Sequence, residues 1–332
     1  MMKSKNLRLV SCAAAALFLI APAAAQDDKF FEGEKLTYVI TTDPGGGYDT
    51  YGRLVAKYME KHLPGSQVIV QNIPGAGHIV GTNTLYAAEP DGLTIGSFNT
   101  GLINSQLLGR EGIQFNLAEM SWIGKAATDT RSLVVSKDCP YQSIDEMRAA
   151  PEPVKMAAAG VGSAAYIDTI LIAEALDLDF EVIPGFDGNE GEMSMMRGEV
   201  CAQIGSTSSL EPFVENGHGK FILQVGGTSE AGVPQARDLA KDERGKSIVA
   251  LIDALSEISR LTAGPPGIPE DRLQILRDAY MAALTDPELL AEAEKLDIPI
   301  EPASGAEVEE RVKAALAQPP ETVALLKEAT KE

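Results

Sequence analysis

The chain is 332 residues long, with 48 acidic and 28 basic residues, 45% hydrophobic residues and a formal net charge of −20 at pH 7. So negative a surface disfavours nucleic acid and anionic lipid as partners, because it repels their charges. Only three cysteines are present and none forms a Cys-X-X-Cys pair, which argues against thiol redox catalysis.

The first residues have the pattern of a secretory signal. A basic head at 3–8 precedes an apolar stretch at 13–20 and small residues at 23–25. We therefore expect residues 1–25 to be a signal peptide that is cleaved near Ala25 and directs the protein to the periplasm. Cleavage leaves 25 basic and 48 acidic residues, a balance of −23. Later segments lack the ~20 apolar residues of a membrane span.

From residue 36 the chain alternates short β-rich runs with amphipathic helical patterns. Strands are predicted at 36–40, 68–70 and 93–98, and helices at 51–62 and 79–88. This βαβαβ order predicts a mostly parallel sheet flanked by helices.

A second unit of the same kind follows. The sequence predicts strands at 133–136, 154–158, 180–183, 200–205 and 221–225, and helices at 165–175 and 190–197. Ser143 and Glu146 form a capping box at the start of a short helix. Cys139 and Cys201 fall near strand ends in this unit, and the sequence leaves open whether they pair.

The last part of the chain has one strand pattern, at 261–264, and then helical patterns at 269–284 and 287–295. Helices without new strands are expected to pack back on the first sheet. The predicted organisation is therefore an α/β protein of two lobes. Residues 26–130 and 251–332 form the first lobe, and residues 131–250 form a second lobe inserted into it.

Four glycine-containing corners, each between a predicted strand and a predicted helix, are the most informative feature of the chain. They lie at residues 41–49, 72–78, 159–163 and 184–188. A helix N-terminus without side-chain bulk offers unpaired backbone N–H groups and the positive end of the helix dipole. Several such corners facing one cleft would hold an anion without lysine or arginine.

Catalytic and cofactor motifs are weak by comparison. Gly160-X-Gly162-X-X-Ala165 fits a relaxed dinucleotide fingerprint, but a lone match is unspecific. Ser163 lies outside a Gly-X-Ser-X-Gly elbow. The three histidines form no His-Glu-X-X-His motif or metal cluster. No cofactor or metal is predicted.

Side chains within the corners allow two interpretations each. Asp49 either caps its helix or meets an amine on a ligand, and His78 either faces a ligand or bonds the start of its helix. Tyr48 is interpreted either as part of the cleft wall or as a hydrogen-bond partner of a ligand. Tyr166 and Phe186 occupy comparable places in the second unit, where Phe186 is as well suited to the core.

Taken together, the corners resemble the Bug family, the extracytoplasmic solute-binding subunits of tripartite tricarboxylate transporters. The resemblance rests on Pro44-Gly45-Gly46-Gly47-Tyr48-Asp49 with Arg53, on Asn72-Ile73-Pro74-Gly75-Ala76-Gly77, and on Pro90-Asp91-Gly92-Leu93-Thr94. It implies a monomeric, two-lobe Venus-flytrap protein that encloses a small organic carboxylate and delivers it to integral membrane permease subunits.

The resemblance also implies a set of ligand-binding positions. In the first lobe these are Gly46, Gly47, Tyr48, Asp49, Gly77, His78, Asn99 and Thr100. In the second lobe they are Gly162, Ser163, Tyr166, Phe186 and Asp187.

The chain departs from the family pattern in its second lobe. Tyr166 stands where family members often carry histidine, and 185–188 lacks their basic residue. This loss weakens the case for a second ligand carboxylate. Asp187 and Glu190 instead favour an amine, hydroxyls or a neutral distal end, and which carboxylate is bound stays open.

Two rival functions use the same cleft. A sensor component would bind a receptor kinase in its closed form, and the sequence does not distinguish this role from transport. An exported enzyme, such as an isomerase or hydrolase, is disfavoured because no base–nucleophile set is evident.

Overall fold

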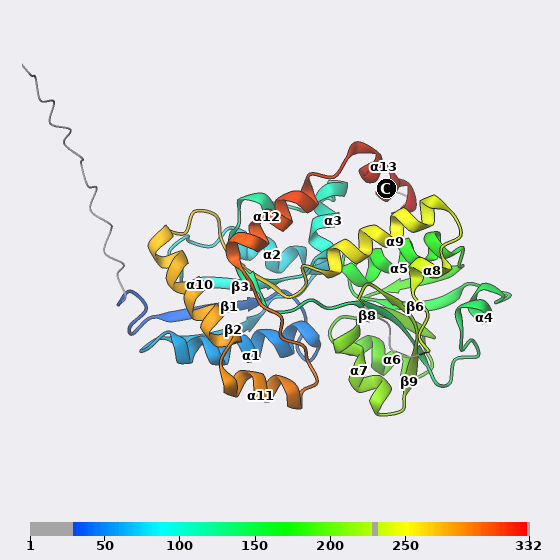
Figure 1. Ribbon diagram of the computed structural model, residues 1–332, viewed down its shortest axis with the longest axis horizontal. Helices are drawn as coiled ribbons and strands as arrows, with labels where there is room; N and C mark the ends of the chain where they lie inside the picture. The colour runs from blue at the N-terminus through cyan, green and yellow to red at the C-terminus, as the bar shows by residue number, and fades with distance from the viewer. Residues whose placement is uncertain (1–28, 228–231, 331–332) are drawn as a thin grey trace, which may run out of the picture.

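The computed structural model describes residues 29–227 and 232–330, so the expected signal peptide lies outside the described residues. Two sheets lie side by side along the long axis of the molecule, each covered by helices on both faces (Figure 1). None of the helices in these two ranges is both long and apolar enough to span a membrane.

The first sheet has the strand order β11-β4-β10-β3-β1-β2. Strands β1 to β4 run in one direction, and β10 and β11 run against them. The strands are β1 (Lys35–Ile40), β2 (Gln67–Asn72), β3 (Thr94–Phe98), β4 (Ser121–Lys125), β10 (Leu261–Gly264) and β11 (Ala303–Ser304).

Helices cover both faces of this sheet. On one face α1, α10 and α11 enclose a core around Tyr38, Met59 and Tyr280. On the other face α2, α3 and α12 enclose a core around Phe98 and Trp122. The bounds are α1 (Gly47–His62), α2 (Ile79–Tyr86), α3 (Gly101–Leu108), α10 (Glu270–Leu284), α11 (Pro287–Lys295) and α12 (Gly305–Leu316).

The second sheet has the order β7-β6-β8-β5-β9, and only β5 among these strands runs against the others. Apolar residues of α4, α5, α8, α9 and α13 pack on one face, and those of α6 and α7 on the other. The strands are β5 (Arg131–Ser136), β6 (Val154–Ala158), β7 (Phe180–Pro184), β8 (Ala202–Ser206) and β9 (Gly219–Val225). The helices are α4 (Ile144–Arg148), α5 (Ala164–Leu176), α6 (Glu190–Met196), α7 (Thr207–Glu215), α8 (Ala236–Leu239), α9 (Glu243–Ser256) and α13 (Pro320–Thr330).

The predicted α/β class is confirmed, and the predicted strands of both units are present. Helices α3, α7 and α9 were not expected. Helix α13 differs in part from the expectation, because it packs on α5 of the second sheet as well as on α3 of the first. The predicted lobe boundary at residue 250 falls within α9, whose apolar face also packs on α5.

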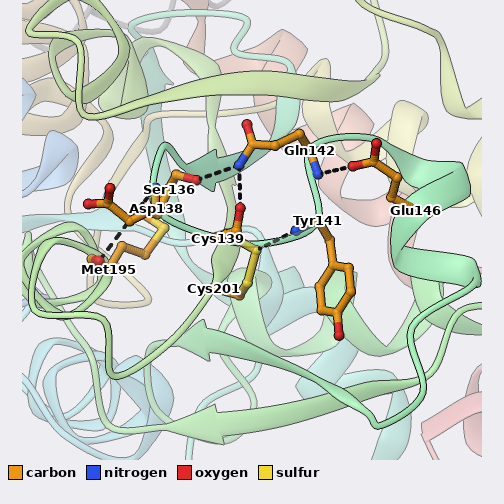
Figure 2. Close-up of a disulfide and its surroundings, with 8 residues drawn as sticks. All are labelled: Ser136, Asp138, Cys139, Tyr141, Gln142, Glu146, Met195 and Cys201. Atoms are coloured by element: carbon orange, nitrogen blue, oxygen red, sulfur yellow. Dashed lines mark hydrogen bonds between the residues drawn. A yellow bond between two sulfur atoms is a disulfide. The ribbon is translucent and has the colours of Figure 1, made fainter.

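Cys139 and Cys201 form a disulfide at the edge of the second sheet where β5 ends and β8 begins, with their Cα atoms 5.2 Å apart (Figure 2). Cys139 follows β5 and Cys201 precedes β8, so the bond joins the ends of two neighbouring strands. The Gln142 side chain fixes the loop after β5, since its Nε2 donates to the carbonyl oxygens of Ser136 and Cys139.

Candidate functional site

A cavity of about 100 Å³ lies between the two sheets, where the carboxyl ends of their strands face each other. A cleft at the carboxyl ends of parallel strands is the usual place for a ligand in open α/β sheets. The predicted site residues that line this cavity are Gly46, Gly47, Tyr48, His78, Asn99, Ser163, Phe186 and Asp187. Other lining residues include Thr42, Arg131, Glu192, Gln203, Ser206 and Ser209.

The first corner presents an uncapped helix end to the cavity. Gly46 is the N-cap of α1, and the described residues provide no side-chain cap hydrogen bond at this helix end. Those groups have no intrahelical acceptor, and the helix dipole makes this end positive. Thr42, just before the corner, is buried and its Oγ1 has no hydrogen-bond partner among the described residues. The corner therefore supplies donors to the cavity without a cationic side chain.

Tyr48 forms part of the cavity wall and is held from two sides. The guanidinium of Arg260 lies 4.5 Å from the centroid of its ring, and the backbone N–H of Thr100 donates to its hydroxyl. Burial raises the pKa of the Tyr48 hydroxyl, an effect that nearby Arg260 partly offsets. A neutral hydroxyl that already accepts a hydrogen bond keeps its own proton to donate to a ligand.

His78 and Asn99 reach the cavity from the next two strand ends of the first sheet. The Nδ1 atom of His78 lies 3.0 Å from the carbonyl oxygen of Thr41. Since a carbonyl only accepts, Nδ1 carries the proton in this contact. The Asn99 Oδ1 accepts from the N–H groups of Gly101 and Ala164, at 2.9 and 3.1 Å, and so joins the two sheets.

In the second sheet, Ser163 and Asp187 shape the opposite wall. Ser163 is the N-cap of α5, where its Oγ accepts from the Tyr166 N–H at 3.2 Å. Asp187 also reaches across the cleft, with Oδ2 3.3 Å from the backbone nitrogen of Asp43 and Oδ1 2.8 Å from that of Gly188. Both oxygens of Asp187 therefore accept backbone hydrogen bonds.

Five predicted site residues lie outside the cavity lining. Both oxygens of Asp49 are engaged, by the Gly45 N–H, the Arg53 Nε and the Asn72 Nδ2, all within 3.0 Å. Burial alone would raise the pKa of Asp49, but these hydrogen bonds hold it below its usual range. Thr100 supports Tyr48, as described above. In the structure, Asp49 stabilises the corner through the Gly45 N–H, which precedes the N-cap Gly46, so it does not make the expected cap of the first turn of α1.

Gly77, Gly162 and Tyr166 complete this group. Tyr166 lines a separate surface pocket, and the Arg110 guanidinium lies 5.9 Å from its ring centroid. Gly77 packs against the backbone of Val161 and Ser163. The Gly162 carbonyl accepts from Ser105 Oγ at 3.0 Å. The two glycines thus contribute contacts between the sheets.

The corner glycines bring the two sheets into backbone contact. A Cβ at Gly46 would lie 2.9 Å from the Gly188 Cα, and one at Gly101 would lie 2.8 Å from the Ala164 Cα. A Cβ at Gly160 would be 2.9 Å from the Gly77 Cα. Separations under 3.0 Å leave no room for a side chain. The glycines therefore serve the fit between the halves as well as the presentation of N–H groups.

The sequence analysis did not find Arg131, a buried cation in the cavity wall. It stands at the start of β5 and is only 9% exposed. Its Nε donates to Asp168 Oδ2 at 2.7 Å and its Nη1 donates to Ser206 Oγ at 3.1 Å. The Nη2 atom is buried without a hydrogen-bond partner among the described residues.

Asp168 is the residue from which a buried cationic partner could have been predicted. It is buried in α5, between the buried apolar residues Ile167 and Leu171. A buried carboxylate requires a partner because an unpaired charge is costly in the interior. Burial raises the pKa of Asp168, and the charge and hydrogen bond of Arg131 counter that rise.

Glu192 is the second carboxylate of the cavity wall. Burial raises its pKa, while its own backbone N–H and the Gln203 side chain hydrogen-bond to it and partly offset the rise. No group of three or more histidine, cysteine, aspartate or glutamate residues in 29–227 and 232–330 is arranged to hold a metal ion. The arrangement of the cavity is that of a binding site for a small polar molecule.

Comparisons with known proteins agree with this geometry. The family described as "Tripartite tricarboxylate transporter family receptor" matches residues 52–312. The chain is 28% identical over 295 residues to the "UPF0065 protein in gbd 5'region" of Cupriavidus necator, covering 87% of this chain and 86% of that protein.

Two solved structures show the same fold. The periplasmic binding protein BugD superposes with a TM-score of 0.76 at 21% identity, covering 90% of this chain and 98% of BugD. MatC from Rhodopseudomonas palustris with bound malate superposes with a TM-score of 0.72 at 19% identity, covering 88% of this chain and 99% of MatC.

Proposed function

The chain belongs to the family of tripartite tricarboxylate transporter receptors, and from that premise we propose that it captures a small organic carboxylate in the cleft between its sheets. The observation that carries the proposal is the uncapped N-terminus of α1 at Gly46 and Gly47, beside the buried hydroxyl of Thr42. A carboxylate accepts hydrogen bonds from such donors, and the dipole of the helix favours its charge.

Membership implies an exported protein, and we place it in the periplasm, with the signal peptide removed near Ala25. Residues 26–130 and 251–332 would act as one lobe and residues 131–250 as the other, except that all of α9 would move with the second lobe and α13 contacts both. Ligand would close the lobes because it contacts both walls, so its affinity for the closed arrangement is the greater. The closed monomer would then dock on integral membrane permease subunits.

We assign the protein no chemistry of its own. His78, the histidine in the cavity wall, uses Nδ1 on a backbone carbonyl, and Ser163 uses its Oγ as a helix cap. Family members and structural neighbours are solute-binding proteins. A sensor component for a receptor kinase would use the same cleft. Pull-down experiments distinguish the two roles, because a transport protein should bind the permease subunits and a sensor should bind the receptor ectodomain.

A thermal-shift screen of the mature protein against organic acids, amino acids and aromatic acids tests the binding role. Ligand that binds only the folded state raises its stability, by about 2.7 kcal/mol at one hundred times the dissociation constant. We expect an upward shift with one class of carboxylate and none with uncharged analogues. A flat response to every acid would overturn the proposal.

The Tyr48→Phe variant provides the matched control for the screen. It keeps the ring against Arg260 and removes only the hydroxyl, so each shift is measured from the variant's own ligand-free melting temperature, which should fall because the Thr100 N–H loses its acceptor. The shift given by the best acid should shrink, because a hydrogen bond to a charged group contributes about 1.5–3 kcal/mol. An undiminished shift would place Tyr48 outside the contacts of the ligand.

A further inference from the structure

Two aspartates from opposite sheets lie close together beside the cavity. Asp43 follows β1 in the first sheet, and Asp187 follows β7 in the second. The backbone N–H of Asp43 donates to Asp187 Oδ2 at 3.3 Å. A Cβ at Gly188, the neighbour of Asp187, would lie 3.6 Å from the Cβ of Asp43. The two corners are therefore in contact, and each brings a carboxyl group to the same place.

The protein compensates the charge of one of these carboxylates and not that of the other. Both oxygens of Asp187 accept backbone hydrogen bonds, from Asp43 and from Gly188. The carboxylate of Asp43 accepts none from the described residues. Asp43 is only partly exposed, so the contact between the corners removes some of its water and supplies no donor in exchange. Asp43 is therefore the group whose charge opposes this contact.

The charged groups that face Asp43 are mostly acidic. Asp187 and Glu190, the first residue of α6, both lie across the contact on the second sheet. Among the described residues His78, on the first sheet, is the group that acts in the opposite sense. Loss of water, followed by the charges of Asp187 and Glu190, raises the pKa of Asp43 above its usual range, and His78 offsets only part of the rise.

Separation of the sheets would remove these effects. Opening about the cleft would move Asp43 away from Asp187 and Glu190 and return water to its carboxylate. Its pKa would then be the ordinary value of about 4. The closed arrangement thus binds a proton at Asp43 more tightly than the open one does, and by linkage a proton favours the closed arrangement to the same extent.

We propose that Asp43 is a proton-binding site linked to closure, so that the protein takes up a proton as it captures its ligand, and that the charge of Asp43 opposes capture at neutral pH. This inference rests on the proposed function, because it needs a ligand that closes the lobes. A transport protein must release its ligand as well as hold it. Like charges that meet only in the closed arrangement favour reopening.

Calorimetric titration of the wild type and of Asp43→Asn over a range of pH tests this proposal, with succinate, malate and benzoate as probes. At neutral pH Asp43→Asn should bind a probe about threefold or more tightly than the wild type, because the repulsion is gone. The two dissociation constants should converge as the pH falls toward about 4, where the wild-type carboxyl is also protonated. Titration of the probe itself cancels, since it affects both proteins alike.

The proton can also be counted directly. Calorimetry in MES and in Bis-Tris, two buffers with different ionisation enthalpies, gives the number of protons taken up with the probe. In the mildly acidic range the wild type should take up more protons than Asp43→Asn does. This measurement does not depend on the affinity of either protein.

Further variants separate the charge of Asp43 from other effects of substitution. Asp43→Ser is neutral and lacks the amide that asparagine could use to bond Asp187, and it should behave as Asp43→Asn does. Glu190→Gln should tighten binding at neutral pH by a smaller factor, because Glu190 raises the pKa of Asp43 less than Asp187 does. Asp145→Asn alters a carboxylate on α4 that is 90% exposed, and it should match the wild type at every pH.

Three outcomes overturn the proposal, and they differ in what else they remove. Equal or weaker binding by both neutral variants at neutral pH removes the role of the Asp43 charge and leaves carboxylate binding intact. A gain in affinity that does not vary with pH, with equal proton uptake by the two proteins, removes the link to a proton. Absence of binding by every probe removes the proposed function together with the proton site.

Discussion

The guanidinium of Arg260 lies between the rings of Tyr48 and Tyr51, 4.5 Å from the centroid of each. The same group donates from Nη2 to Asp129 Oδ2 at 2.6 Å and to Ser209 Oγ at 2.9 Å. Tyr48 and Tyr51 belong to α1 on the first sheet, whereas Ser209 belongs to α7 on the second. One buried side chain therefore couples a wall of the cavity to the junction between the sheets.

Arg260→Gln should destabilise the protein by about 3–5 kcal/mol, because it leaves the Asp129 carboxylate buried and unpaired. The double variant Arg260→Gln with Asp129→Asn removes both charges and should be more stable than the single variant. Urea unfolding of the wild type, both single variants and the double variant measures this coupling. Additive losses would show that the pair does not act as a unit.

Gly101→Ala should weaken ligand binding at least tenfold and should also lower the melting temperature of the ligand-free protein. Gly101 is the first residue of α3, where alanine is the better helix former. Its Cβ would, however, meet the backbone of Ser163 and Ala164 across the cleft. The lobes could then no longer approach fully.

Titration calorimetry with the strongest acid of the screen, beside thermal melting, measures both effects. Ser105→Ala is the control on the same helix, since it removes the hydrogen bond to Gly162 and adds no bulk. It should cost only about 0.5–1.5 kcal/mol of affinity. Wild-type affinity in Gly101→Ala would mean that the bound state is more open than the contacts at α3 indicate.

Loss of the disulfide should lower stability and leave binding unchanged. The bond between Cys139 and Cys201 spans 62 residues, and removal of such a cross-link typically costs about 2–5 kcal/mol. Neither cysteine lines the cavity, so the Cys139→Ser, Cys201→Ser variant should keep the wild-type dissociation constant. Unfolding of the wild type with and without reductant provides the second measurement, and equal stability in both would contradict the prediction.

Asp286 should contribute to the acid stability of the protein. It caps α11 and accepts from Lys61 and His62 at the end of α1, and the hydrogen bonds that it accepts from Lys61 and from the Glu288 N–H lower its pKa to about 2. An unfolded aspartate titrates near pH 4. The stability that Asp286 contributes is therefore fully present above about pH 4 and is lost as the pH falls through about 2.

Asp286→Asn keeps the cap and removes the charge, so its deficit relative to the wild type should grow between pH 2 and pH 4 and stay constant above. Denaturant unfolding at several pH values measures this difference. Asp145→Asn, which alters a carboxylate that is 90% exposed, is the control and should show no such growth. A deficit for Asp286→Asn that does not vary with pH would contradict the assignment.

Local patterns in the sequence were sufficient for the α/β class and for most strands, because strand and helix periodicity is a property of neighbouring residues. They were insufficient for α3, which has little contrast between its faces since almost all of it is buried. The stretch 243–256 was missed because its polar first turn continues a polar loop. The contact of helix α13 with α5 of the second sheet was missed because packing partners depend on tertiary contacts.

Some residues of the candidate site could be predicted from the sequence and others could not. Corners built of consecutive residues, such as 41–49, place Gly46, Gly47 and Tyr48 at the cavity as expected. Arg131 was missed because its orientation in the cavity wall depends on Asp168, which is 37 residues away in the sequence and contacts it only in the folded protein. Asp49 had a capping interpretation, and the structure shows that its oxygens are used within the corner. Whether the lining residues contact a ligand stays a prediction.

Because α13 packs on α5, the two ends of the described residues lie at different parts of the molecule. The described residues begin at Lys29 beside the first sheet and end at Thr330 in α13, which packs on α5 of the second sheet and on α3 (Figure 1). Fluorescent dyes attached near these two ends would therefore sit on opposite halves of the molecule. Closure about the cleft would change the energy transfer between them, which makes the protein a ready scaffold for an optical sensor of its own ligand.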